Sequence, residues 1–132
     1  MKHAILALLL FVVALTAGAQ TVHHKNTKST VYYVVVASFE TLQDARDFNN
    51  NGPADTVCGN IYQAQAKGKT VYRVVESCYY SEAKAKQKIS LIADYFHEWR
   101  GLTPWIWRNK GEAHCIERGL GNDGNYISTR PQ

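Results

Sequence analysis

Apolar side chains follow two patterns along the chain, and together they predict strands that alternate with helices. Residues 31–39 form a dense run of β-branched and aromatic side chains, which predicts a central strand contacted on both faces. Between residues 85 and 99 the apolar positions recur at spacings of 4, 3, 4 and 3. This pattern predicts an amphipathic helix with Ser81 as its N-cap and Gly101 at its end. Residues 105–107 then predict a last strand.

Capping and turn signals place the other elements. Thr41 is positioned to cap a short helix, which ends where residues 49–53 run Asn-Asn-Asn-Gly-Pro. Residues 56–66 and 70–79 predict two strands that form a hairpin around the turn at residues 67–69. The predicted order of elements is therefore βαββαβ.

The first strand and the start of the first helix are echoed forty residues later in the chain. A repeat of this kind indicates one strand-helix unit used twice, and two copies are too few for a solenoid. We therefore expect a closed domain with internal pseudo-symmetry. The matched positions are Val31, Tyr32, Val34, Val35, Phe39 and Ala45 against Val71, Tyr72, Val74, Val75, Tyr79 and Ala85.

The first residues predict export. Lys2 and His3 precede an apolar run, and Ala17-Gly18-Ala19 supplies the small residues that signal peptidase accepts, so residues 1–19 are interpreted as a secretory signal. A membrane anchor is the weaker alternative, because the run is shorter than the roughly 20 residues that a spanning helix needs. The expected location is the periplasm or cell envelope. We expect a flexible leader at residues 20–30, one domain at residues 31–109, and a glycine-rich extension at residues 110–132 with an edge strand near residues 113–117.

The three cysteines, Cys58, Cys78 and Cys115, are compatible with a disulfide in an exported protein. If the hairpin turn is centred on Gly68, Cys58 lies directly opposite Cys78, at a separation that a disulfide accepts. The alternative is a register shift of one residue. That shift would place the two sulfurs on opposite faces and leave Cys115 as a competing partner.

Composition and motifs favour a binding protein over an enzyme. The net charge of +4 comes from scattered Lys and Arg residues, which gives nucleic-acid binding little support. The sequence contains neither a phosphate-binding loop nor a nucleophile elbow, and no third ligand lies at zinc-site spacing from His23 and His24. His114 and Cys115 are adjacent, but neighbours on a strand point to opposite faces, so a structural role is favoured over a nucleophile. We expect no catalysis, no cofactor and no metal.

Two spaced motifs resemble those of the sporulation-related repeat (SPOR) domain family. The resemblance covers about Val31 to Asn109, and it implies an α+β, ferredoxin-like fold in which two helices cover one face of a four-stranded antiparallel sheet. It further implies binding to septal peptidoglycan glycan strands without stem peptides, in the setting of cell division. The residues that carry it are Tyr32-Tyr33-Val34-Val35-Val36-Ala37-Ser38-Phe39 and Tyr72-Arg73-Val74-Val75, each followed by an alanine-containing helix.

The chain departs from the family motifs at positions that matter for the ligand. Val35 stands where the first motif carries Gln, and Ala37 stands where it carries Gly. Residues 77–79 are Ser-Cys-Tyr in place of Gly-Pro-Phe in the second motif. The exchange of Gln for Val removes a hydrogen-bond donor and an acceptor from the sheet face that grips sugar hydroxyls in the family. Glycan binding would therefore require replacement contacts.

Strand alternation selects the candidate binding residues. If Val34, Val74 and Ile106 face the helices, the neighbouring positions lie on the open face of the sheet. Aromatic rings beside a cationic donor suit a sugar, whose C–H face packs on rings while its hydroxyls seek polar partners. The outward positions are Tyr33, Val35, Arg73, Val75, Trp105 and Trp107, and the first motif adds Ser38 by resemblance.

Two other interpretations of the same face stay open. The glycine-rich extension folds back in one of them and buries Trp105 and Trp107 as a satellite core. In the other, the face docks an envelope or division protein, with Val35 and Val75 as the dry centre of the interface.

Overall fold

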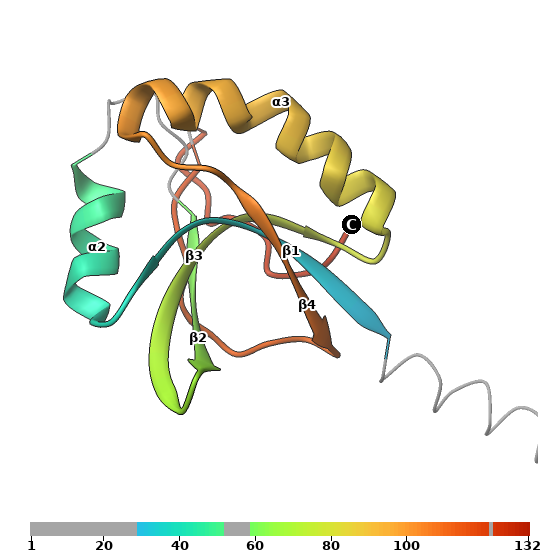
Figure 1. The fold of residues 1–132 in the computed structure, drawn as a ribbon, viewed down its shortest axis with the longest axis horizontal. Coiled ribbons are helices and arrows are strands. Elements are labelled where there is room, and N and C mark those ends of the chain that lie inside the picture. The colour runs from blue at the N-terminus through green and yellow to red at the C-terminus, as the bar shows by residue number, and fades with distance from the viewer. Residues whose placement is uncertain (1–28, 52–58, 122) are drawn as a thin grey trace, which may run out of the picture.

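The computed structural model describes residues 29–51, 59–121 and 123–132. These residues form an α+β fold of two helices and a five-stranded antiparallel sheet with strand order β4-β1-β3-β2-β5. Figure 1 shows how α2, α3 and the strands β1 to β4 are arranged. Its first six elements follow the predicted order of strands and helices. The elements are β1 (Thr30–Phe39), α2 (Leu42–Asn50), β2 (Asn60–Ala66), β3 (Lys69–Tyr79), α3 (Glu82–Arg100), β4 (Trp105–Lys110) and β5 (Cys115–Glu117). The predicted signal at residues 1–19 and most of the predicted leader lie outside the described residues.

The predicted helix caps are confirmed. Thr41 has an extended backbone, and its hydroxyl accepts a hydrogen bond from the Asp44 N–H at 3.1 Å. Ser81 caps α3 in the same way, and Gly101 ends that helix in the left-handed conformation with φ of 65°. Within the described residues, no helix combines the length and apolar character needed to cross a bilayer.

The register of the β2–β3 hairpin differs by one residue from the prediction. Lys67 and Gly68 both have positive φ, 52° and 77°, and form a two-residue turn, so Ala66 pairs with Lys69. Such turns match the right-handed twist of the flanking strands, which explains why the turn is shorter than predicted. The predicted Cys58–Cys78 disulfide is absent, because Cys78 is a free thiol. Cys58 itself lies outside the described residues.

Both helices pack on one face of the sheet, as alternation predicted. Val34 and Ile106 contact the side of α3 that carries Ala85, and Val74 lies in a second cluster with Ala45 of α2. These contacts are apolar throughout, and they fix which residues of each strand point away from the helices. The buried members of the two clusters are Val34, Val36, Ala37, Ala45, Ile61, Val74, Tyr79, Ala85 and Phe96.

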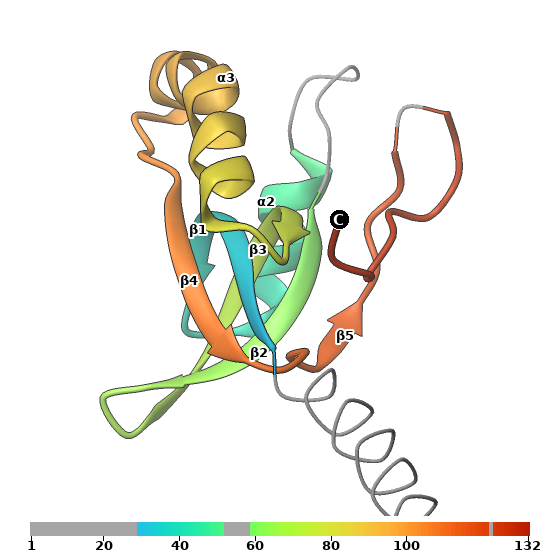
Figure 2. The ribbon, with the colours of Figure 1, turned by 90° about the vertical axis from the view of Figure 1, so that its right-hand side faces the viewer.

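Residues 111–132, named here the C-terminal segment, continue the fold beyond β4. Ala113 and Cys115 pack against the sheet face opposite the helices, and β5 adds a fifth strand beside β2 (Figure 2). The expected edge strand near residues 113–117 is thus present, and the expected count of four strands becomes five. The rest of the segment returns to β3, where the Gln132 backbone accepts from the Tyr80 N–H and donates to the Cys78 carbonyl.

Candidate functional site

The seven predicted binding residues differ strongly in exposure. Tyr33, Val35 and Val75 are almost completely buried, so the expectation of an open face is wrong for these three positions. The physical reason is the C-terminal segment, whose Ala113 and Cys115 pack against the cluster that the three residues form. Of the other four predicted residues, Trp107 and Arg73 are half-buried, Ser38 is exposed, and Trp105 keeps 40% of its surface exposed.

The buried tyrosines support the ring of Trp107. Tyr33 pairs with Trp107 across β1 and β4, and their ring centroids are 4.8 Å apart. Tyr62 packs on both, with centroid distances of 5.0 Å to Tyr33 and 6.3 Å to Trp107. The Tyr33 hydroxyl accepts a hydrogen bond of 2.7 Å from the Ala113 N–H, and burial raises the pKa of Tyr33 to about 12. The indole of Trp107 is therefore held by packed rings.

Arg73 lies against both indoles that β4 presents. Its guanidinium carbon is 4.6 Å from the ring centroid of Trp107 and 4.9 Å from that of Trp105, within the range of cation–π contacts. Its Nε atom is buried without a hydrogen-bond partner, and burial lowers the pKa of the guanidinium. Ser38 is the cross-strand partner of Arg73 on β1. The alternation of side chains along β3 and β4 thus correctly predicted that Arg73, Trp105 and Trp107 lie together. We name these three residues the indole cluster.

An open hollow of about 520 Å³ adjoins the indole cluster through Trp107. Asn109 lies two residues beyond Trp107 on β4, so its amide shares the face of the indole, whereas alternation turns the side chains of Gln63 and Gln65 toward the helix face. The hollow therefore combines an apolar ring with one side-chain amide, that of Asn109. Within this set there is no acidic side chain. The lining residues are Gln63, Ala64, Gln65, Trp107, Asn109, Ala113 and His114.

Sequence reasoning missed the polar lining of this hollow. Gln63 and Gln65 lie on a strand that carries no ligand signal, and Asn109 lies at the end of β4. The sequence singles out His114 only as the neighbour of Cys115. These residues meet because the chain crosses from β4 to β5, and that crossing has no periodic pattern from which to predict it.

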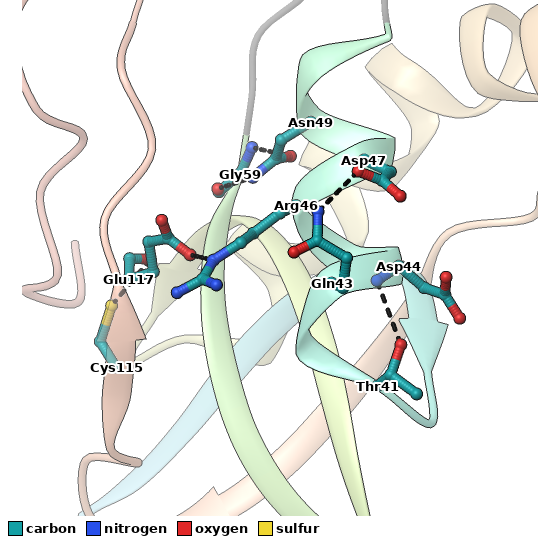
Figure 3. A network of polar contacts seen from close by, with 9 residues as sticks. All are labelled: Thr41, Gln43, Asp44, Arg46, Asp47, Asn49, Gly59, Cys115 and Glu117. Carbon is teal, nitrogen blue, oxygen red and sulfur yellow. Dashed lines mark hydrogen bonds and ion pairs between the residues drawn. The ribbon is translucent and has the colours of Figure 1, made fainter.

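A polar network fixes the position of β5 beside α2 (Figure 3). Arg46 of α2 forms an ion pair of 2.7 Å with Glu117, and the Cys115 thiol donates to the Glu117 carbonyl. On the same helix, the Asn49 amide accepts from the Gly59 N–H and donates to the Gly59 carbonyl, which anchors the start of β2. The network therefore positions both β2 and β5.

The two described thiols are poor candidates for a nucleophile. Burial raises the pKa of Cys78 to about 12, and burial also raises the pKa of Cys115. The reactive thiolate is disfavoured at both positions. Among the described residues, no group of three or more His, Cys, Asp or Glu side chains is arranged to hold a metal ion.

Comparisons of the chain with protein-family models, with curated proteins and with solved structures give no match. The resemblance to SPOR domains is therefore carried by the motif residues alone, and the functional argument depends on the geometry of the indole cluster and the hollow.

Proposed function

We propose that this chain is an exported, non-catalytic module that binds peptidoglycan glycan strands at the indole cluster and the adjoining hollow. The observation that carries the proposal is the position of Trp107. Its indole is fixed by Tyr33 and Tyr62, contacts Arg73, and lines a hollow that Asn109 of the same strand also borders. A sugar ring is matched by this pattern, because its C–H face packs on an aromatic ring while its hydroxyls pair with planar polar groups.

The fold supports the same proposal. The strand order β4-β1-β3-β2 together with two helices on one face is consistent with a ferredoxin-like core, to which β5 is an addition. In this interpretation the core corresponds to the SPOR-like domain predicted at residues 31–109, and the chain works in the cell envelope, where division proteins act.

The structure also bears on the missing glutamine of the first family motif. Val35 is fully buried, so this position offers no surface to a ligand. Asn109 borders the hollow instead, and its amide is a replacement contact of the kind that the sequence required. The proposed site is therefore displaced from the centre of the sheet face toward its exposed end.

A protein partner on the same face is the weaker candidate. Such an interface needs Val35 and Val75 as its dry centre, and both are buried within the chain. Docking would therefore depend on Trp105 and the rim of the hollow, without an apolar centre.

The test is co-sedimentation with cell-wall sacculi, both intact and partly stripped of stem peptides, so that the remaining cross-links keep the wall insoluble. We expect the protein to sediment with stripped sacculi, and Trp105→Ala to weaken binding about tenfold, since one stacked ring contributes about 1 kcal/mol or more beyond its buried area. The matched control is Tyr95→Ala, because Tyr95 is 43% exposed on α3 and Trp105 is 40% exposed. Failure of the wild-type protein to bind either wall form would refute the proposal.

A further inference from the structure

Arg73 is a half-buried cation for which the described residues supply no anion. It takes part in none of the ion pairs of the described structure, and no charged neighbour acts on its pKa, which burial alone lowers. Its described contacts are the two indole faces of the indole cluster. Partial burial of a cation is costly unless a partner offsets the lost hydration, and ring faces offset only part of that cost.

The arrangement fixes how the guanidinium can be used. Nε is sealed from solvent without a partner, so the terminal Nη groups are the donors that a ligand can reach. Trp105 and Trp107 hold the plane of the guanidinium, which reduces the loss of side-chain freedom when a planar anion binds to it. A carboxylate accepts two parallel N–H bonds from such a fork, and this pairing is about twice as strong as a neutral hydrogen bond.

We infer that Arg73 forms a subsite for a carboxylate carried by the glycan, with the sugar ring in the adjoining hollow. This inference rests on the proposed function and specifies the class of sugar, namely an acidic one. Hydrolysing the amide bond that joins a stem peptide to the glycan leaves a carboxylate, and a uronic acid offers the same group. The shared chemistry is a carboxylate next to a sugar ring, and Lys does not present the same fork.

The experiment compares one polymer with and without its carboxylates. Stripped sacculi are divided, and one half is treated with a carbodiimide and ammonia, which converts each carboxylate into a neutral amide. We expect wild-type protein to bind the untreated half at least tenfold more tightly, with a difference that shrinks as salt is added. Polygalacturonate and its methyl ester, compared in the same way, distinguish a uronic acid from the wall carboxylate as the source of the group.

Variants locate the effect at Arg73. Arg73→Gln should bind the untreated polymer about as weakly as wild type binds the amidated polymer, and should gain nothing from the carboxylates. Arg73→Lys keeps the charge without the fork and should fall between them. Lys84→Gln removes one charge from α3 and is the matched control. Circular dichroism and indole fluorescence verify that each variant keeps the packing of Trp107.

The possible outcomes separate this inference from the proposed function. If wild type binds the amidated and untreated polymers equally, the carboxylate subsite is refuted while glycan binding stands. The same conclusion follows if Arg73→Gln keeps the preference for the untreated polymer. If wild type binds neither polymer, the proposed function fails, and the carboxylate subsite fails with it.

Discussion

The two faces of the sheet are covered in different ways, and the difference explains where a ligand can bind. On the helix face, α2 and α3 contribute buried apolar side chains such as Ala45, Ala85 and Phe96. On the other face, the C-terminal segment adds only partly buried side chains, and much of its attachment is polar. Apolar burial is roughly proportional to the area removed from water, whereas each hydrogen bond holds the chain at one point. The second face is therefore closed at its centre and open at the indole cluster.

The largest expected effect comes from the helix face. Phe96→Ala should lower the free energy of unfolding by about 3 to 5 kcal/mol, because it removes a buried ring and leaves a cavity among packed residues. Chemical denaturation at neutral pH measures the change. The control is Leu91→Ala on the same helix, where the side chain is 75% exposed and the expected change is within about 0.5 kcal/mol. Equal effects of the two substitutions would show that burial of Phe96 in the core does not stabilise the protein.

The second prediction concerns pH and the face under the C-terminal segment. Burial raises the pKa of Tyr33 to about 12, so the folded state holds this proton more tightly than the unfolded state does. The stabilisation due to the Tyr33 proton is therefore fully present below pH 10. As the pH rises from 10 to 12, this contribution to the free energy of unfolding is lost, which amounts to about 2 to 3 kcal/mol. Burial raises the pKa of Tyr62 as well, in the same direction.

Denaturation midpoints between pH 9 and 12, followed together with tyrosinate absorbance, measure this loss. Tyr33→Phe should be less stable at neutral pH, since the Ala113 N–H loses its acceptor, but it should show a shallower decline above pH 10. An equally steep decline in Tyr33→Phe would contradict the assignment to Tyr33.

The C-terminal segment should open separately from the helix face when its polar anchor is removed. The buried Asn60 amide donates to the Ser128 carbonyl at 3.2 Å and accepts from the Gly119 N–H at 2.8 Å. Asn60→Ala should cost about 1 to 2 kcal/mol and speed hydrogen exchange of the segment while exchange in α3 stays unchanged. Gln65→Ala on the same strand is exposed and should leave both rates unchanged. Uniformly faster exchange would show that the segment and the helices open as one unit.

The two faces also differ in how far the sequence predicted them. Helix caps and face assignments came from local signals, because Thr41, Ser81 and Gly101 act on backbone groups within one turn. The hairpin register was wrong by one residue, since Lys67 adopts a left-handed conformation for which its residue type has no preference. Backbone groups such as those of Ser128 and Gln132 hold much of the covering segment. Any residue type supplies such groups, so no pattern of side chains in the sequence predicts that the C-terminal segment covers this face.

The candidate site shows the same division. Alternation along β4 and β3 predicted that Trp105, Trp107 and Arg73 share a face, because spacing by two residues fixes the side of a strand. Ala64 of β2 and His114 of the crossing to β5 join them only through the long-range geometry of the sheet. Local periodicity therefore predicted the part of the site on β3 and β4 and could not predict the part that β2 and the crossing supply.

The smallest expected effect tests the link between the two faces. Arg46 and Glu117 join α2 to β5 at 2.7 Å, but their side chains are 44% and 41% exposed, so water and salt weaken the pair. A double-mutant cycle with Arg46→Ala and Glu117→Ala should give a coupling free energy below about 1 kcal/mol, smaller still at 1 M salt. If the pair instead contributes several kcal/mol, the helix face and the segment are one cooperative unit, and the Asn60 variant should then destabilise both.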